Sequence, residues 1–447
     1  MENLTVQQLV EKWAPVLDDS NSPKITDKHR REVTAVCLEN QEREAIKANG
    51  GQPLNEAAHA NAGGGGLALG GAGTLTGATV AGYDPVLISL VRRAMPQMIA
   101  YDLCGVQPLT QPTGLIFAMK ARYGGQSGNE ALFNEADSDF SGKSTAESGR
   151  TGSGAHAGTG PFDDPYTYGT GMTTASAEAL GSSGGGTFNE MSFTIERTSV
   201  TAQTRALKAE YTIELAQDLQ SVHGLSAEGE LSKILSTEIL SEMNREVIRN
   251  IYVSAKAGAQ NNTATAGTFD LDVDSNGRWS VEKFKGLMFQ IERDANVVAQ
   301  RTRRGKANFL LCSSDVASAL MMAGILDYNP ALQNNLSVDE ANSTFAGVLK
   351  NGMKVYVDPY ASNYGANQFV LVGYKGPSAW DAGMYYCPYI PLQMYKTTDP
   401  DTFQPKIAYK TRYGMVANPF TSLDAAGNGL AAGNNYYYSK FRVTNLL

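Results

Sequence analysis

Cysteine is scarce in this sequence, and its spacing excludes the folds that cysteine usually holds together. The 447 residues contain four cysteines, far apart and without a CxxC pair: Cys37, Cys104, Cys312 and Cys387. A disulfide scaffold or a zinc ribbon needs closely spaced cysteines, so neither is expected. The pattern fits a protein that works in a reducing compartment.

Charge is also sparse, and positive charge is in the minority. Charged residues make up 18% of the chain, and 37 basic against 45 acidic side chains give a net charge of −8. A dedicated nucleic-acid binder carries a net basic face, so this balance argues against that class. There is no run of 18 apolar residues, and the N-terminus lacks the pattern of a secretory signal. We therefore expect no membrane span.

Motifs for catalysis are missing or incomplete. The HExxH, P-loop and GxGxxG patterns do not occur, and only four histidines are present: His29, His59, His156 and His223. A GxSxG pattern over residues 181–185 places Ser183 in Ser/Gly-rich sequence, whereas a nucleophile elbow needs a strand before it and a helix after it. We therefore predict no catalytic residue and no cofactor, and a hydrolase is only a distant alternative.

One acidic loop begins like a calcium site. The segment from Asp272 to Gly277 matches the start of an EF-hand loop, which needs a bidentate glutamate at its twelfth position. Lys283 stands at that position, and Glu282 comes one place early. A turn leading into the next helix is the simpler interpretation, so no metal site is predicted. A calcium-binding surface or adhesin protein is the alternative from a different class, since it would also account for the 46 glycines.

Composition changes abruptly at residue 56. Residues 1–56 contain 7 basic and 10 acidic side chains, with apolar residues at helical spacing between Val33 and Ile46, whereas no charged residue occurs between Glu56 and Asp84. Glycine-rich sequence such as residues 63–66 loses much conformational entropy when it forms a helix or strand, so regular structure is disfavoured there. We predict a separable helical segment over residues 1–56, followed by an extended arm.

Periodicity in the rest of the chain predicts both helices and strands. Alternation over residues 113–122 and 191–207 predicts the two strands of a long hairpin, with a glycine-rich insertion at 124–190. Ser226 is suited to cap a helix of about 30 residues that Gly258 would close. Its apolar stripe comprises Leu231, Leu235, Ile239, Met243, Val247 and Ile251.

A mixed region follows the long helix. We expect a second helix at 281–304, a strand at 308–312, a short helix capped by Ser314 or Asp315, and strands at 353–358, 369–374, 385–393, 404–413 and 436–443. The basic cluster at residues 301–306 falls at a predicted helix C-terminus, where cations are favourable; contact with nucleic acid or an acidic neighbour is the alternative. The predicted class is α+β, with about three domains or one large elaborated domain.

Several long strings of this sequence are similar to one family. They are VRRAMP at 91–96, CGVQP at 104–108, LKAEYTIELAQDL at 207–219, FAGVL at 345–349, GYKGP at 373–377, FQP at 403–405 and KTRYG at 410–414. In these strings and in the order of its parts, the chain resembles the major capsid proteins of T-even-like tailed bacteriophages (myoviruses), of the Hong Kong 97 type.

The resemblance implies a fold and a division of the chain. Residues 1–56 would be a cleaved N-terminal propeptide, 57–96 an N-arm, 97–116 the first part of a peripheral domain, 117–205 an extended loop with its insertion at 124–190, 206–258 the peripheral domain with a long spine helix, 259–379 an axial domain, 380–417 peripheral-domain strands and 418–447 the C-terminal part of the axial domain.

The resemblance also implies a structural function. Subunits would form hexameric capsomers of an icosahedral or prolate shell around a double-stranded DNA genome, without sequence-specific binding. The expected partners are other copies of the chain, a vertex protein, an internal scaffold, a prohead protease, a portal and decoration proteins, with no membrane. The expected location is the virion capsid, assembled in the host bacterial cytoplasm.

Proteolytic maturation is expected between Glu56 and Ala57. T-even-like capsid proteins resemble one another in being cut after Leu/Ile-x-Glu, and Leu54-Asn55-Glu56 fits this pattern at the composition change. The same pattern occurs at residues 9–11 and 240–242. Within the class, a paralogous vertex (pentamer) protein or a cellular shell-forming compartment protein is the alternative.

Overall fold

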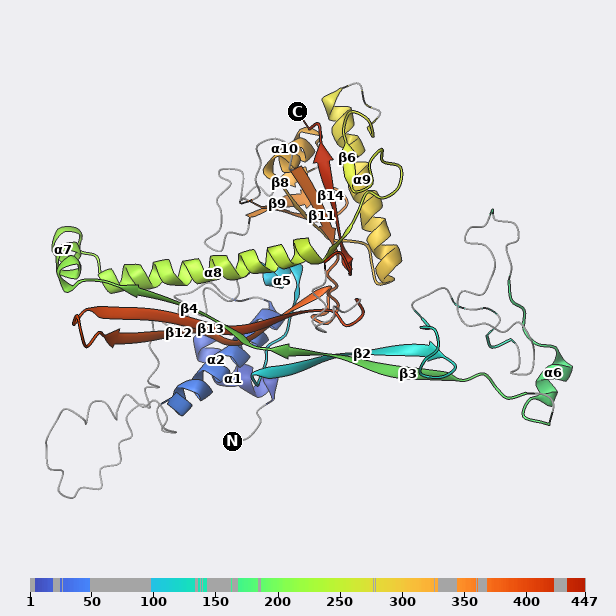
Figure 1. Ribbon diagram of the computed structural model, residues 1–447, viewed down its shortest axis with the longest axis horizontal. Coiled ribbons are helices and arrows are strands. Elements are labelled where there is room, and N and C mark those ends of the chain that lie inside the picture. Colours follow the sequence, from blue (N-terminus) through green and yellow to red (C-terminus); the bar gives the residue numbers. More distant parts are fainter. Residues whose placement is uncertain are drawn as a thin grey trace, which may run out of the picture. The chain divides into compact units, whose positions relative to one another are not determined.

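The computed structural model describes most of the chain (Figure 1). The described residues are 5–18, 25, 27–48, 98–132, 136, 138, 140–142, 162, 168–183, 186–275, 277, 279–324, 326–328, 344–358, 360, 368–421 and 432–446. They fall into two compact units, Leu115–Ser199 and the remainder of the chain. The predicted arm, the cleavage residues Leu54, Glu56 and Ala57, and both His59 and His156 lie outside the described residues.

A four-stranded sheet and one long helix form the first half of the larger unit. The sheet order is β1 (Gly105–Val106), β12 (Met384–Thr398), β13 (Pro405–Ala417) and β4 (Gln203–Glu210). β12 and β13 pair antiparallel from Met384↔Ala417 to Thr398↔Pro405, and β1 joins β12 in parallel. Figure 1 shows α8 (Ala227–Ser254) running lengthwise along this sheet.

The long helix forms where the sequence predicts it. The Ser226 side chain accepts a hydrogen bond from the Gly229 N–H, and Glu228 and Glu230 lie in the first turn, which suits the helix dipole. The residues of the stripe from Leu235 to Ile251 are buried, and the Tyr386 hydroxyl of β12 lies 3.8 Å from the Met243 sulfur. Burial of this one face against the sheet holds the helix in place.

An eight-stranded sheet forms the second half of the same unit. Its order is β5 (Ala255–Ala257), β14 (Asn435–Thr444), β11 (Gln368–Gly373), β7 (Phe309–Cys312), β10 (Lys354–Val357), β9 (Thr344–Leu349) and β8 (Leu326–Tyr328), and β6 (Thr268–Asp270) also pairs with β14. Helices α9 (Ser280–Thr302) and α10 (Ser314–Met322) pack next to each other and against its strands. The central strands β7, β10 and β11 are almost entirely buried, as expected for strands covered on both faces.

Three helices from the N-terminal part of the chain complete the larger unit. α1 (Val6–Leu17) packs on α2 (Lys28–Ala48), and α2 packs on β12. The short α5 (Ala100–Leu103) leads into β1. The helix predicted through Val33, Val36 and Ile46 is therefore confirmed as α2.

The smaller unit is built on a two-stranded ribbon. β2 (Thr113–Tyr123) pairs with β3 (Met191–Thr201), which confirms the predicted hairpin. The predicted second strand, 191–207, is too long: β3 ends at Thr201, and residues 203–207 belong to β4 of the four-stranded sheet. Between the strands, a short helix α6 (Thr174–Ala179) is capped by the Thr173 side chain, which accepts from the Ser176 N–H at 3.3 Å. With both units described, the α+β class is confirmed.

Some predicted element boundaries are wrong. α8 ends at Ser254 and continues as β5, so Gly258 does not close it. A Cβ at residue 258 would lie 2.1 Å from the Asp294 carboxylate, so Gly258 is required by a close approach between elements. α10 is preceded by Ser313 as its N-cap residue, one position before the predicted Ser314.

Several elements that the periodicity did not predict are present, among them α7 and β9. α7 (Ile213–His223) begins with the Thr212 side chain accepting from the Leu215 N–H and ends at Gly224, which has a positive φ of 66°. β9 pairs antiparallel with β10. His223 is in the last turn of α7.

Candidate assembly surfaces

One face of the β2–β3 ribbon is apolar and exposed. Every second residue on each strand points to it, with exposed fractions between 54% and 71%: Leu115, Phe117 and Met119 on β2, and Met191, Phe193 and Ile195 on β3. We call these six residues the ribbon face. A two-stranded ribbon is marginally stable in water, and a contiguous apolar patch marks a contact surface. The ribbon face is therefore a candidate assembly surface.

Charged residues of the ribbon hold its two strands together. Glu196 of β3 accepts from Lys120 Nζ at 2.7 Å and from Arg122 Nη2 at 3.4 Å on β2. The Arg122 guanidinium also donates to the Thr194 hydroxyl at 3.0 Å and to the Gly128 carbonyl at 2.9 Å. Substitutions on the ribbon face leave these cross-strand contacts in place.

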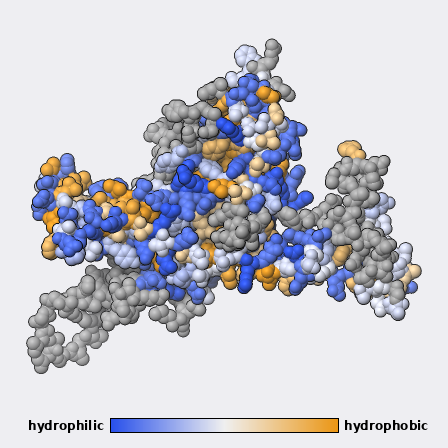
Figure 2. Space-filling model, viewed as in Figure 1, coloured by the Kyte–Doolittle hydropathy of each residue, from blue (hydrophilic) through white to orange (hydrophobic). Residues whose placement is uncertain are grey.

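A second exposed apolar surface lies at the end of α8 that is close to α7. Figure 2 shows hydrophobic residues gathered over α7 and this end of α8. The exposed side chains are Ile213, Leu215, Val222, Leu225 and Ile234. No residue of α7 is buried, so intramolecular packing gives this helix little support.

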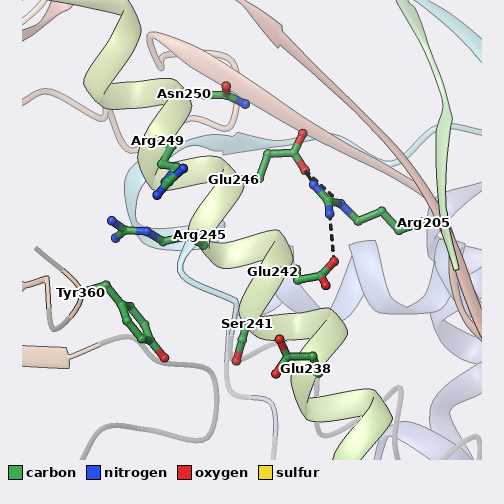
Figure 3. Close-up of a pocket in the computed structure, with 9 residues that line it drawn as sticks. All are labelled: Arg205, Glu238, Ser241, Glu242, Arg245, Glu246, Arg249, Asn250 and Tyr360. Carbon is green, nitrogen blue, oxygen red and sulfur yellow. Dashed lines mark hydrogen bonds and ion pairs between the residues drawn. The ribbon is translucent and has the colours of Figure 1, made fainter. Parts of the chain in front are cut away.

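A charged groove runs along α8 (Figure 3). It has a volume of about 620 Å³ and is lined by Arg205, Glu238, Ser241, Glu242, Arg245, Glu246, Arg249, Asn250 and Tyr360. Arg205 of β4 donates to Glu246 at 2.6 Å and to Glu242 at 2.9 Å. The Tyr413 hydroxyl of β13 also donates to Glu246, and burial together with this carboxylate raises the pKa of Tyr413. These contacts join α8 to two strands of the sheet.

A buried aspartate joins α8 to the eight-stranded sheet. The Asp358 side chain, at the end of β10, is fully buried and accepts from Arg245 Nη1 at 2.7 Å and 2.8 Å. It also accepts from the Tyr252 hydroxyl at 2.8 Å and from the Tyr360 N–H at 2.9 Å. Burial raises the pKa of Tyr252, so this hydroxyl stays a donor.

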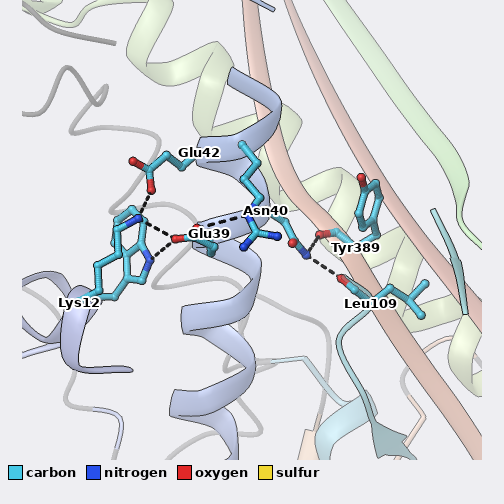
Figure 4. A network of polar contacts seen from close by, with 8 residues as sticks. Lys12, Glu39, Asn40, Glu42, Leu109 and Tyr389 are labelled. Carbon is cyan, nitrogen blue, oxygen red and sulfur yellow. Dashed lines mark hydrogen bonds and ion pairs between the residues drawn. The ribbon is translucent and has the colours of Figure 1, made fainter. Parts of the chain in front are cut away.

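The N-terminal helices are fastened to each other and to the body by polar contacts (Figure 4). Lys12 of α1 donates to Glu39 at 2.7 Å and to Glu42 at 2.5 Å on α2. Burial alone would raise the pKa of Glu39, but the hydrogen bonds from Lys12 and Trp13 lower it. Asn40 Nδ2 donates to the Leu109 carbonyl at 2.7 Å and to the Tyr389 carbonyl at 2.9 Å.

The residues tested as a calcium loop are used for other contacts. Both Asp274 oxygens accept backbone N–H groups, from Ala264 at 2.8 Å and Asp270 at 2.9 Å. Asp272 is paired with Lys283, the residue in the twelfth position. Residues 271–274 form the predicted turn. Within the described part of the chain, no group of three or more His, Cys, Asp or Glu side chains could hold a metal ion.

Other motifs singled out in the sequence also have local roles. Ser183 lies in a turn after α6, with no strand before it. In the basic cluster, Lys306 pairs with Glu292, and Arg304 Nε lies 3.9 Å from Asp381. Both acidic partners are intramolecular, and α9 ends at Thr302 inside the cluster as predicted.

The four cysteines are buried and unpaired. Burial raises the pKa of Cys37, Cys104, Cys312 and Cys387 to about 12. Their thiols are therefore protonated and unreactive while the fold is intact. Among the described helices, none is long and apolar enough to cross a membrane.

The described surfaces are those of a subunit that assembles. Large apolar residues are exposed on the ribbon and on α7, and the described surface also carries a charged groove and an open pocket of about 370 Å³. This combination is typical of a structural protein whose surface is completed by neighbours.

Comparison with known proteins identifies the family. The model of the family "Major capsid protein Gp23" matches residues 80–443. The chain is 39% identical to the major capsid protein of Serratia phage KSP90, over 100% of this chain and 99% of that one. It is 42% identical to the major capsid protein of Salmonella phage ViI, over 82% and 86% of the two chains. It is 36% identical to the major capsid protein of Enterobacteria phage T4, over 93% and 92%.

The chain belongs to the Gp23 family of major capsid proteins, and its function is that of a structural protein of the virion capsid of T4-like phages. Similarity to the capsid vertex protein of phage T4 is lower, 26% identity over 51% of this chain. The major capsid protein is therefore favoured over the vertex paralogue. Among solved structures, the capsid of Myoviridae phage XM1 aligns with 77% of this chain and 92% of that chain, with 10% identity and a TM-score of 0.39.

Proposed function

We propose that this major capsid protein forms hexameric capsomers of an icosahedral or prolate shell around double-stranded DNA, with an organisation of the Hong Kong 97 type. The ribbon face carries this proposal, because six large apolar side chains remain exposed on a two-stranded element. A second copy of the chain would cover them in the shell.

The sheet composition supports the division into peripheral and axial domains. The four-stranded sheet is built from residues 105–106, 203–210, 384–398 and 405–417, with α8 as the spine helix. The eight-stranded sheet is built from residues between 255 and 373 together with 435–444. Apart from β5 and the start of β4, these stretches correspond to the ranges expected for the two domains.

Substitution of the ribbon face tests the assembly proposal. The double variant Phe117→Ser and Phe193→Ser should fold as the parent does, because both side chains are already exposed, 71% and 60%. We expect it to form no shells when co-expressed with the other head proteins. The control Phe289→Ser, in α9 and 70% exposed, should still assemble. Shells from the double variant in parental yield, seen by electron microscopy, would contradict the proposal.

We also propose cleavage between Glu56 and Ala57. Of the three Leu/Ile-x-Glu matches, residues 9–11 lie inside α1 and residues 240–242 inside α8, where a protease cannot bind the chain in extended form. This leaves Leu54, Glu56 and Ala57 as the preferred site. Removing 7 basic and 10 acidic residues would change the net charge from −8 to −5.

Intact-mass spectrometry of finished particles tests the cleavage. A subunit that begins at Ala57 is the expected result, and a subunit that begins at Met1 rules the cleavage out. The variant Glu56→Ala should accumulate uncut subunits. The variant Glu11→Ala, at another match to the pattern, should be cut normally.

The partners and location follow from the same proposal. They are other copies of the chain, a vertex protein, an internal scaffold, a prohead protease, a portal and decoration proteins, with assembly in the host bacterial cytoplasm. The net charge of −8 fits a shell that encloses DNA without binding its sequence, because few phosphates are neutralised.

A further inference from the structure

The middle of α2 lies inside the larger unit. Residues 33–40, more than two turns of this helix, are all buried. A surface helix exposes one face, so burial all round shows that α1 covers one side of α2 and the body covers the other. The buried side chains include Val33, Val36, Cys37 and Leu38, which belong to the same hydrophobic core as α8 and β12.

Polar contacts to the body follow α2 along most of its length. Near its start, the His29 ring is hydrogen-bonded to the Val106 carbonyl at 2.9 Å. Arg30 donates to Asp102 at 2.9 Å, and its guanidinium lies 5.1 Å from the centre of the Tyr101 ring. Near its end, the Tyr389 hydroxyl donates to Glu44 at 3.2 Å.

Asn40 makes the most specific of these contacts. Its amide donates to the carbonyls of Leu109 and Tyr389, which come from segments 280 residues apart in sequence (389 − 109). The hydrogen bond between the Asn40 amide and the Tyr389 carbonyl is buried. Loss of the Asn40 amide would therefore leave this carbonyl without a donor. We call the surface formed by α5, β1, Leu109 and residues 385–392 of β12 the α2 cradle.

All body residues of the α2 cradle lie after the proposed cut, and all residues that fill it lie before. We propose that the α2 cradle is a binding site for the helical pair α1–α2, so that cleavage at Glu56 leaves the N-terminal segment bound to its own subunit as a non-covalent ligand. This inference rests on the proposed cleavage. Cutting the chain removes none of the contacts described above, so release of the segment requires a separate step that opens the α2 cradle.

The α1 helix packs on α2 and makes the ligand a pair of helices. Leu9, Trp13 and Leu17 are buried, and Lys12 pairs with Glu39 and Glu42 of α2. The ligand is thus a preformed helical pair, which loses less conformational freedom on binding than a disordered peptide.

An engineered cut tests the inference without the natural protease. Residues 50–53 of the full-length chain are replaced by the recognition sequence of a site-specific protease, and the purified protein is cut at micromolar concentration. We expect the two fragments to elute together in gel filtration and Cys37 to stay unlabelled by a thiol reagent. Separation of the fragments, with Cys37 labelled within the mixing time, would overturn the inference.

Substitutions in α1 and α2 give a second test, in which the rate of Cys37 labelling after the cut is measured. Asn40→Ala should speed labelling of Cys37 after the cut by roughly tenfold or more, because two carbonyls lose their donor. Arg30→Gln weakens a partly exposed ion pair, so it should speed the labelling of Cys37 less. It replaces Asn40→Ala if that variant does not fold. Glu11→Gln, on the exposed side of α1, should leave the rate unchanged. Equal rates in all variants would show that these contacts do not hold the segment.

The two proposals fail in different ways. Particles whose subunits begin at Met1 would refute the natural cleavage at Glu56, but the result of the engineered cut would still hold. Separation of the two fragments after the engineered cut would refute the α2 cradle as a binding site, but the proposed cleavage at Glu56 would still hold.

Discussion

Asp358 is a buried carboxylate whose three partners come from α8 and from its own loop. Arg245, the Tyr252 hydroxyl and the Tyr360 N–H all donate to it. The Arg245 side chain keeps only 25% of its surface exposed, so without Asp358 its charge would be poorly compensated. This residue therefore ties α8 to the eight-stranded sheet.

Asp358→Ala should lower the free energy of unfolding by about 2–4 kcal/mol, because it leaves a mostly buried guanidinium and a hydroxyl without their acceptor. Chemical denaturation of the assembly-incompetent ribbon-face variant measures this on soluble subunits. Asp272→Asn removes an exposed partner of Lys283 and should change stability little. An equal effect of the two substitutions would contradict the assigned role of Asp358.

Asp294 of α9 should make stability depend on pH. Burial raises the pKa of its carboxyl, although the Ala259 N–H, Arg301, Ser439 and Gln290 lower it. The raised pKa in the folded state means that the contribution is fully present below the unfolded pKa and is lost as pH rises through the folded pKa. The stability of the parent relative to Asp294→Asn should therefore fall as pH rises from about 4.

Denaturation of both proteins in a series of buffers from mildly acidic to neutral pH measures this difference. Other titrating groups are common to the two chains and cancel. A difference that stays constant over the series would show that Asp294 does not titrate between the two states.

Two isoleucines of α8 allow the effect of packing to be measured apart from the effect of helix propensity. Ile239 is 1% exposed and Ile234, five positions earlier on the same helix, is 60% exposed. Ile239→Ala should cost about 3 kcal/mol through lost burial and the cavity it leaves, whereas Ile234→Ala should change stability by less than about 0.5 kcal/mol. Thermal denaturation of the two variants measures the contrast, and similar melting temperatures would refute it.

Elements with one buried face could be predicted from the sequence, and their ends could not. The spacing from Leu235 to Ile251 predicted α8 because burial repeats with the helical period. Gly258 was interpreted as a helix end, but it is small because Asp294 and Ser439 lie against it. Contacts between distant elements leave no local signal of this kind.

The candidate surfaces show the same limit. The string TGLIFAMKAR has apolar residues on both faces of the strand: Ile116 is buried and Phe117 is exposed. Alternation therefore predicted the strand but not its exposed face. α7 was missed although Thr212 and Gly224 cap it, because its apolar residues bury nothing within the subunit.

At the scale of the whole molecule, pairing between distant segments builds both sheets. β1 pairs in parallel with β12, and β7 in parallel with β10, across long stretches of sequence. Local periodicity gives the strands but not these partners, so the sheet order could not be predicted from it. The resemblance to a capsid family supplied a division of the chain into domains, and that division stays a prediction.

The insertion belongs to the smaller unit alone. The described contacts of residues 138–189 are made within Leu115–Ser199: the Gly169 N–H donates to the Ser138 hydroxyl at 2.8 Å, and the rings of Tyr123 and Phe140 lie 4.5 Å apart. The pairing of β2 with β3 and the contacts of Glu196 with Lys120 and Arg122 do not involve residues 145–185. The ribbon can therefore keep its register without them.

Deletion of residues 145–185 should leave the folding of the larger unit intact. Its two sheets, α8 and the buried tyrosines Tyr386, Tyr409 and Tyr438 all lie outside the smaller unit. We expect an unchanged near-ultraviolet circular dichroism spectrum from these tyrosines and a cooperative unfolding transition at the parental midpoint. Loss of that transition would mean that the insertion supports the core of the larger unit. Because the ribbon face is also retained, the shortened subunit should still require Phe117 and Phe193 for assembly.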